Sequence, residues 1–107
     1  CMTEDMKTKI KSLVEKNKIL IFMKGTPQAP QCGFSARAVQ SLQKAGADKI
    51  ESINILADRD MYSAIREYTD WPTFPQVFIN GKFVGGCDIV TEMLQNGELQ
   101  KEVGIKK

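Results

Sequence analysis

The pattern of hydrophobic and polar residues predicts short helices and strands that follow one another along the chain. Apolar residues recur at helical spacing over residues 4–15 and predict an amphipathic helix there, formed by Met6, Ile10, Leu13 and Val14. Its polar face carries Lys7, Lys9, Lys11 and Lys16. The next segment, Ile19–Met23, is wholly apolar and five residues long. A run this short favours a strand buried on both faces over a helix.

The middle of the chain places a cysteine at the start of a helix. The loop Lys24–Gln31, punctuated by glycine and proline, delivers Cys32 to a helical pattern that ends near Ala45. Ser52–Ile55 then alternates in the manner of a second strand. Asp58 can cap a third helix, whose apolar face is made of Met61, Ile65 and Tyr68.

The last third of the chain predicts a hairpin followed by a pair of helices. The segments Gln76–Ile79 and Lys82–Val84 flank Asn80-Gly81, the strongest local hairpin signal in the sequence. The helical pair begins at Cys87 and is broken by a glycine at position 97. A right-handed crossover between the first two strands makes them parallel, next to an antiparallel hairpin. We therefore expect one α/β domain over residues 1–107 with a thioredoxin-like fold, a four-stranded mixed sheet flanked by helices.

Composition excludes two broad classes of function. Hydrophobic residues make up 42% of the 107 residues, and no apolar run is long enough to cross a bilayer, so a membrane protein is not expected. The net charge of +2 comes from 15 basic and 13 acidic residues that are interspersed. The sequence thus lacks the concentrated positive charge typical of nucleic-acid binding.

The cysteine count indicates a reducing compartment. Cys1, Cys32 and Cys87 are odd in number and widely spaced, which argues against a secreted disulfide framework. Met2 is typical of an initiator, so Cys1 is given no role. We expect a cytoplasmic protein, with a mitochondrial or other organelle matrix, after loss of a transit peptide, as the alternative.

Cys32 is the residue with the clearest chemistry. In the run Cys32-Gly33-Phe34-Ser35 a serine stands where a second redox cysteine is common, so this thiol must find its partner sulfur elsewhere. Helix-start amides and the nearby Lys24 can lower a cysteine pKa from about 8.5 to roughly 3.5–7.5. The alternative is an inert buried cysteine, which a position behind a polar, proline-rich loop disfavours.

Two other segments are expected on the same rim of the sheet. Trp71–Pro75 sets two prolines around a strand start; a cis bond there would expose a backbone edge to an extended peptide, and a plain rigid turn is the alternative. Gly85-Gly86 lets backbone approach a ligand before the helix start at Asp88, although such pairs are more often simple loops. Together with the thiol, these segments outline a pocket for a small anionic thiol peptide.

Four motifs in order resemble the monothiol glutaredoxins of the CGFS type over nearly the whole chain. They are Lys24-Gly25-Thr26-Pro27, Cys32-Gly33-Phe34-Ser35, Trp71-Pro72-Thr73-Phe74-Pro75-Gln76 and Gly85-Gly86-Cys87-Asp88-Ile89. The resemblance implies a glutathione site beside the catalytic Cys32, Gly33 and Phe34. In this site Lys24 and Gln76 receive the glycine carboxylate, Thr73 and Phe74 pair with the cysteinyl backbone before cis-Pro75, and Cys87 and Asp88 receive the γ-glutamyl end.

One position departs from the family pattern. The family usually carries an arginine nine residues before the tryptophan, beside the glutathione carboxylate, and this chain has Tyr62 there. Arg66, one helical turn later, is the expected substitute, and Arg59 is the less favoured one.

The resemblance also implies that Cys32 ligates a shared [2Fe–2S] cluster. Such a cluster normally takes four thiolates, so two Cys32 and two glutathione thiolates predict a homodimer that forms around the cluster and a monomer without it. The expected function is delivery of clusters to apo iron–sulfur proteins. The alternative is a glutathione-dependent oxidoreductase acting on protein–glutathione mixed disulfides, with at most weak activity. A third reading is a regulatory adaptor that pairs with a BolA-like protein, which would supply the missing ligand. The sequence leaves open whether Cys87 forms a disulfide with Cys32.

Overall fold

The computed structural model describes residues 4–104, so Cys1 lies outside the described residues. The elements in chain order are α1 (Glu4–Lys16), β1 (Ile19–Met23), α2 (Gly33–Lys44), β2 (Glu51–Asn54), the short 3₁₀ helix η1 (Ile55–Ala57), α3 (Arg59–Thr69), β3 (Gln76–Ile79), β4 (Lys82–Gly85), α4 (Cys87–Asn96) and α5 (Glu98–Gly104). No helix in this part of the chain is long and apolar enough to span a membrane.

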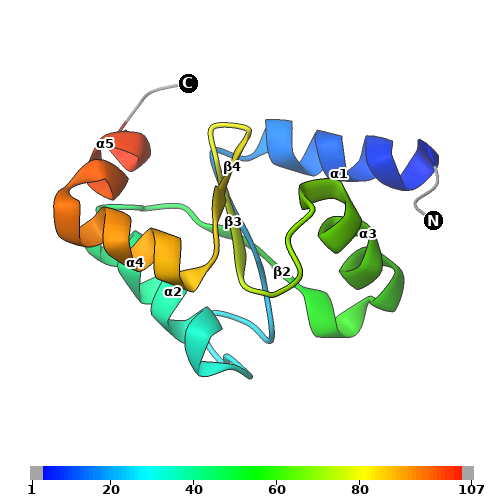
Figure 1. Ribbon diagram of the computed structural model, residues 1–107, viewed down its shortest axis with the longest axis horizontal. Helices are drawn as coiled ribbons and strands as arrows, with labels where there is room; N and C mark the ends of the chain where they lie inside the picture. The colour runs from blue at the N-terminus through cyan, green and yellow to red at the C-terminus, as the bar shows by residue number, and fades with distance from the viewer. Residues whose placement is uncertain (1–3, 105–107) are drawn as a thin grey trace.

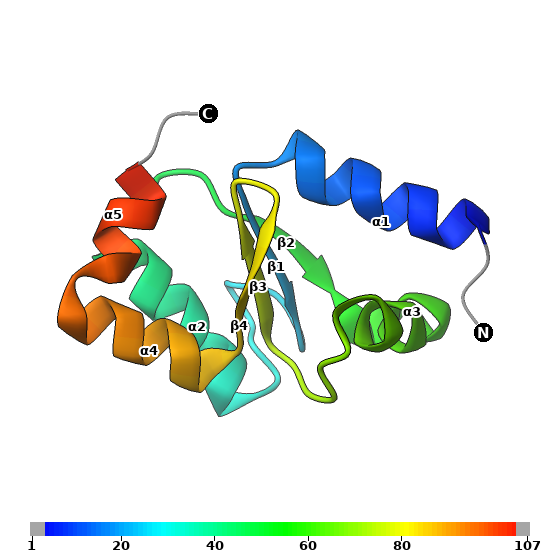
Figure 2. The ribbon, with the colours of Figure 1, turned by 45° about the horizontal axis from the view of Figure 1, so that its top comes forward.

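The four strands form one mixed sheet in the order β2-β1-β3-β4. β1 and β2 are parallel, whereas β1 with β3 and β3 with β4 are antiparallel. Helices α2, α4 and α5 cover one face of this sheet, and α1 and α3 cover the other (Figures 1 and 2). The predicted four-stranded mixed sheet flanked by helices is confirmed.

The central strand β1 divides the core in two. All five of its residues are buried, as the apolar run predicts. Ile19, Ile21 and Met23 pack with α2, α4 and α5. Leu20 and Phe22 point to the opposite face and pack with α1 and α3. The period of two along a strand thus gives each helical layer its own apolar surface, and both layers hold β1 at the centre.

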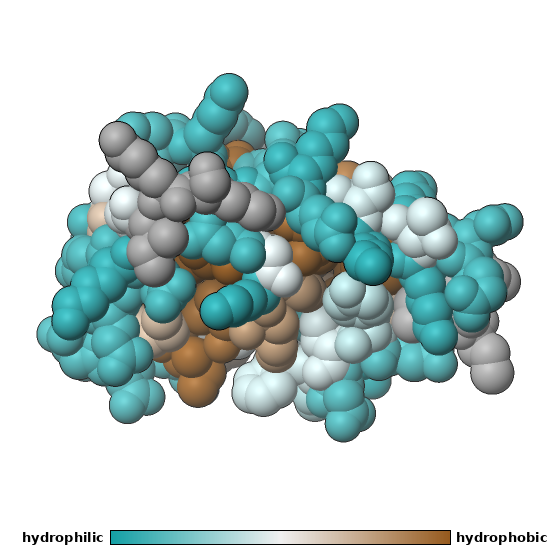
Figure 3. Space-filling view, turned by 90° about the horizontal axis from the view of Figure 1, so that it is seen from above, coloured by the Kyte–Doolittle hydropathy of each residue, from teal (hydrophilic) through white to brown (hydrophobic). Residues whose placement is uncertain are grey.

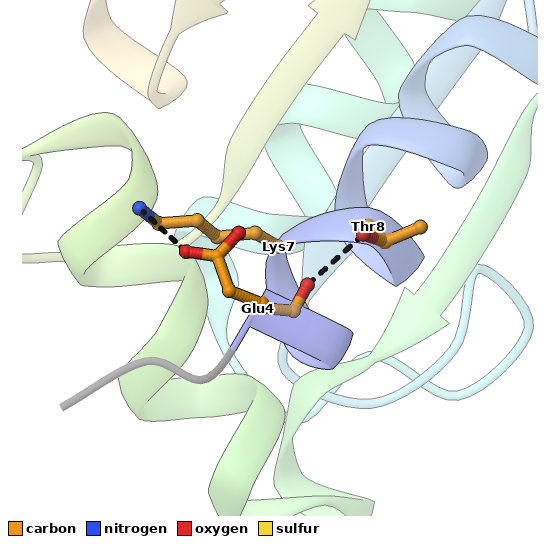
Figure 4. A network of polar contacts seen from close by, with 3 residues as sticks. All are labelled: Glu4, Lys7 and Thr8. Carbon is orange, nitrogen blue, oxygen red and sulfur yellow. Dashed lines mark hydrogen bonds and ion pairs between the residues drawn. The ribbon is translucent and has the colours of Figure 1, made fainter.

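Helix α1 attaches by its apolar face and leaves its lysines exposed. Ile10 and Val14 are buried, while Lys7, Lys9, Lys11 and Lys16 are exposed. In its first turn Lys7 lies 3.8 Å from the Glu4 carboxylate, and the Thr8 hydroxyl donates to the Glu4 carbonyl (Figure 4). Seen from above, the molecule is mainly hydrophilic, with hydrophobic surface in patches (Figure 3).

The predicted turns and caps are present. Asp58 accepts a hydrogen bond from the Met61 amide and caps α3. Asn80 and Gly81 have φ of 54° and 82°, as a two-residue hairpin turn requires. Gly97, with φ of 88°, separates α4 from α5.

The structure differs from the sequence prediction at the end of the second strand and on the buried face of α3. The second strand ends at Asn54, and Ile55 begins η1 instead of ending the strand, because the Asn54 side chain accepts from the Leu56 amide and starts a helical turn. Tyr68 is 39% exposed, so the buried face of α3 rests on Met61, Ala64 and Ile65.

Candidate functional site

A groove of about 420 Å³ lies where β1 ends, β3 begins and helices α2 and α4 start. It is lined by Lys24, Cys32, Phe34, Trp71, Thr73, Phe74, Pro75, Gly86, Cys87, Asp88 and Ile89. The topology therefore brings four separate segments of the sequence to one rim of the sheet, as predicted. Eight of the predicted site residues are among these lining residues.

Cys32 occupies the N-cap position of α2 with extended backbone, and its thiol is partly exposed. The Ser35 backbone N–H is the main cause that lowers the pKa of this thiol. Partial burial opposes the effect, whereas the Phe34 N–H, the Lys24 charge and the Ser35 hydroxyl lower the pKa further. Since a negative sulfur is favoured by each of these donors and by the cation, the thiolate is stabilised as the sequence predicted.

Ser35 links the thiol to the end of β1. Its side chain is fully buried, and its hydroxyl oxygen accepts a hydrogen bond of 3.1 Å from the Lys24 backbone N–H. The residue that replaces a second cysteine thus ties α2 to the segment that carries the groove's lysine.

The segment before β3 forms one wall of the groove. The Phe74–Pro75 peptide bond is cis, as the resemblance implies. Gly86 packs against this wall: a Cβ there would lie 3.2 Å from the Pro75 carbonyl oxygen and 3.3 Å from Trp71 Nε1. A side chain at position 86 would therefore press on the wall.

Cys87 and Asp88 begin α4 and line the groove. Cys87 is only 7% exposed, and its sulfur lies 3.9 Å from the Thr91 hydroxyl. That hydroxyl donates to the Cys87 carbonyl at 2.7 Å. Asp88 is exposed in the first turn of the helix, where its carboxylate is available to a cationic group of a ligand.

Gln76 does not lie in the groove, which corrects the expectation that it contacts a carboxylate. Its side chain is fully buried. The amide nitrogen donates to the carbonyls of Trp71 and Thr73, and the amide oxygen accepts from the Thr69 hydroxyl. Because these bonds occupy the amide on both sides, Gln76 shapes the groove wall from behind.

Arg66 also lies outside the groove in this structure. It lines a neighbouring hollow that shares Trp71, and its guanidinium carbon lies 5.8 Å from the centre of the Tyr62 ring. Tyr62 in turn packs against Phe74, with ring centres 4.8 Å apart. Arg59 lines a different hollow beside Tyr62. Neither arginine reaches the groove here, and Lys24 is its one lining cation among the described residues.

The remaining predicted residue, Gly33, is exposed as the first residue of α2. Of the three other lining residues, Gly86 belongs to the glycine pair that was expected to approach a ligand, whereas Trp71 and Ile89 belong to the quoted motifs and were assigned no contact. Phe34 and Ile89 are 61% and 37% exposed and give the groove an apolar rim. Large exposed apolar side chains beside a reactive group are the signal that could have identified Ile89.

The described residues offer no ready metal site within one chain. Among residues 4–104, no group of three or more histidine, cysteine, aspartate or glutamate side chains is close enough to hold a metal ion. Cys32 alone combines partial exposure with a lowered pKa in this part of the chain. Any iron centre here needs ligands from beyond residues 4–104 of one chain.

Comparison with known proteins gives consistent matches. The glutaredoxin family model matches residues 19–84. The chain is 55% identical over 93 residues to Glutaredoxin 4 of Buchnera aphidicola, covering 87% of this chain and 85% of that protein. It is 50% identical over 100 residues to an uncharacterized monothiol glutaredoxin, ycf64-like, of Synechocystis, covering 94% and 92%. Other relatives are mitochondrial proteins.

Solved structures agree with these matches. The solution structure of reduced poplar apo GrxS14 has a TM-score of 0.80 at 47% identity, covering 92% of this chain and 89% of that one. The crystal structure of a buckwheat glutaredoxin–glutathione complex has a TM-score of 0.79 at 30% identity, covering 95% and 94%. These likenesses confirm the predicted thioredoxin-like fold.

Proposed function

Because the chain belongs to the glutaredoxin family, we propose that it binds glutathione in this groove and carries a [2Fe–2S] cluster as cargo between two copies of the chain. Its relatives named as monothiol glutaredoxins agree with the single thiol of the Cys32-Gly33-Phe34-Ser35 run. The cluster would be passed to apo iron–sulfur proteins. The carrying observation is one activated thiol at the open end of a groove sized for a small peptide.

The groove chemistry supports glutathione as the ligand. Lys24 offers a cation to the glycine carboxylate and has no ion-pair partner among residues 4–104, and exposed Asp88 offers an anion to the γ-glutamyl amine at the opposite end. Thr73 and Phe74 line the same groove and would offer backbone groups to the central residue. This order would leave the glutathione sulfur beside Cys32. A related buckwheat glutaredoxin has been solved as a glutathione complex.

Ligand counting supports a shared cluster. Four thiolates hold a typical [2Fe–2S] cluster. The chain contains no histidine, and Cys87 is nearly buried. Residues 4–104 of each chain therefore supply one accessible thiol, that of Cys32. Two Cys32 and two glutathione thiolates complete the set. The apolar side chains of Phe34 and Ile89 at the rim suit a surface that is covered when two copies meet. We expect the chain without cluster to be monomeric.

A second candidate function is glutathione-dependent reduction of protein–glutathione mixed disulfides. Its support is the lowered pKa of Cys32, because attack on a disulfide needs a thiolate. In this reaction the Cys32 thiolate attacks the glutathione sulfur, the protein thiolate leaves, and free glutathione then reduces the Cys32–glutathione disulfide. We expect this activity to be weak. A BolA-like partner would form a heterodimer by supplying a ligand that this chain lacks.

We also propose that residues 1–107 form one domain and that the protein works in a reducing compartment, the cytoplasm or an organelle matrix. The single sheet that all four strands share supports one domain, and the odd number of widely spaced cysteines supports a reducing compartment.

Cluster transfer tests the proposal. The protein is loaded anaerobically with iron, sulfide and glutathione, sized, and mixed with an apo plant-type ferredoxin, whose circular dichroism reports cluster arrival. We expect a coloured dimer that loads the ferredoxin and does not form when glutathione is omitted. A cluster on a monomer, equal yield without any thiol, or no transfer would contradict the carrier role.

A further inference from the structure

The peptide segment that carries Lys24 is held by polar groups from three directions. The Lys24 N–H donates to Ser35 Oγ at 3.1 Å, and the Lys24 carbonyl accepts from the Gln31 N–H at 2.9 Å. The Gly25 N–H donates to Asn54 Oδ1 at 3.0 Å. The Lys24 N–H, the Lys24 carbonyl and the Gly25 N–H are therefore hydrogen-bonded by α2, by the end of the Lys24–Gln31 loop and by the end of β2, respectively.

Asn54 extends the sheet by one hydrogen bond beyond its last backbone pair. Met23, the last residue of β1, is in register with Asn54, the last residue of β2. Two residues after Met23, the Gly25 N–H donates to the Asn54 side chain. A side chain accepts this hydrogen bond because the backbone of β2 turns into η1 after Asn54. The same Asn54 oxygen accepts from the Leu56 N–H at 3.1 Å. One atom thus fixes both the turn after β1 and the turn after β2.

The turn has little room to adopt another shape. Gly25 has φ of 91°, and a Cβ at this position would lie 2.6 Å from the Ala29 carbonyl oxygen and 2.6 Å from the Gln31 nitrogen. The chain therefore leaves β1 along one tightly packed path. The direction in which the Lys24 side chain leaves the sheet depends on the groups that hold this path.

We propose that Asn54 is a positioning residue, which acts through the Lys24–Gly25 peptide to aim the Lys24 ammonium at the carboxylate of the bound ligand. Asn54 does not line the groove, so it has no direct contact to offer. The inference rests on the proposed function, in which Lys24 receives the glycine carboxylate of glutathione. The inference predicts that Asn54 affects binding of the glycine carboxylate and does not affect binding of the rest of the ligand.

Substitution by serine is designed to remove one of the two hydrogen bonds that Asn54 accepts and to keep the other. Serine is as good an N-cap as asparagine, so Asn54→Ser is expected to keep the Leu56 bond and the fold. Its side chain is one bond shorter, and we expect it to release the Gly25 N–H. Amide hydrogen exchange at Gly25 measures this directly, and faster exchange is expected. Asn17→Ser is the matched control, since Asn17 donates to the Leu13 carbonyl at the opposite end of β1.

The test measures binding of glutathione and of its C-terminal glycine amide by NMR titration under reducing conditions. Asn54→Ser should weaken glutathione binding about threefold, the effect of one lost hydrogen bond, and leave binding of the amide unchanged. The Asn17→Ser control should change neither. In a Lys24→Met background, Asn54→Ser should have no further effect on glutathione, because the group through which it acts is gone.

Three results would overturn the inference. They are equal weakening of glutathione and its amide by Asn54→Ser, unchanged binding of both despite faster exchange at Gly25, and a full additional effect in the Lys24→Met background. A native protein that binds glutathione no better than its amide would overturn the proposed carboxylate contact and the inference together. A native protein that prefers glutathione, combined with any of the first three results, would leave the proposed function standing and reject Asn54 alone.

Discussion

Cys32 and Cys87 each lie at the start of a helix and line the same groove, yet their surroundings differ. Cys32 is partly exposed. Hydrogen bonds from the Ser35 and Phe34 backbone N–H groups and the Lys24 charge lower the pKa of its thiol. Cys87 is nearly buried, with the Thr91 hydroxyl beside its sulfur. A helix start alone therefore does not make a cysteine reactive. Exposure, aligned amides and a nearby cation together distinguish Cys32, the proposed reactive thiol, from Cys87.

The largest expected effect comes from removing each sulfur in turn. Cys32→Ser should abolish cluster loading, because the thiolate is lost. At neutral pH the folded variant should be alkylated about 100-fold or more slowly than the native protein. Cys87→Ser should reduce loading by no more than about threefold, since the proposed role of this nearly buried sulfur is to contact the ligand and not to hold iron. Iron and sulfide analysis after reconstitution, with Cys1→Ser in both variants, measures the difference. Equal loss in both would mean that Cys87 ligates iron or resolves Cys32.

A second thiol beside Cys32 should redirect its chemistry. Ser35→Cys places a sulfur on the first turn of α2 and permits a disulfide with Cys32 that the native chain cannot form there. The new thiol also replaces the hydroxyl that accepts from the Lys24 N–H. We expect disulfide reduction coupled to glutathione to rise about tenfold, with reduced cluster loading. Both proteins carry Cys87→Ser so that no groove thiol can substitute. Equal turnover in the two would favour the reductase over the carrier.

The pH dependence of alkylation isolates the contribution of Lys24. The pKa of Cys32 is lowered in the folded protein, first by the Ser35 N–H and more weakly by Lys24. Lys24→Met should therefore move the pKa upward and slow iodoacetamide alkylation about threefold at a pH below it. The two rates should converge at high pH, where both thiols are ionised. The chain carries Cys1→Ser and Cys87→Ser in this measurement. An equal reduction at every pH would mean that Lys24 affects access to the thiol and not its charge.

The smallest expected effect comes from replacing Thr91, the neighbour of the buried Cys87. Thr91→Val removes the hydroxyl 3.9 Å from the Cys87 sulfur and its 2.7 Å bond to the Cys87 carbonyl. We expect less than about a twofold change in glutathione affinity, because this bond repeats one that the helix backbone already provides. NMR titration measures it. A larger loss of affinity would show that the orientation of Cys87 controls binding in the groove.

The sequence predicted the frame of the molecule because its signals are local. The buried run Ile19–Met23, the Asp58 cap and the Asn80-Gly81 turn each act through neighbouring residues, and all three are confirmed. The end of β2 was misplaced because Ile55 continues the apolar alternation. The competing signal was the hydrogen-bonding capacity of Asn54, which periodicity does not reveal.

The structure places most of the predicted site residues in one groove and leaves Gln76 and Arg66 outside it. The motifs correctly brought Cys32 and Lys24 to one groove. Gln76 was assigned to the ligand because the family resemblance implies that contact, but its amide donates to the Trp71 and Thr73 carbonyls behind the wall. Arg66 was assigned from helical spacing, which gives its neighbours along α3 and not the distance to the groove. Burial and side-chain direction depend on contacts between distant segments, and a single sequence does not show them.

The composition of the loaded assembly tests the carrier role most directly. Native mass spectrometry of protein reconstituted with iron, sulfide and glutathione should give one main species of two chains, one [2Fe–2S] cluster and two glutathione molecules. Cys32→Ser should give a bare single chain under the same conditions. A cluster bound to one chain, or a loaded dimer without glutathione, would contradict the shared-cluster arrangement on which the proposed function depends.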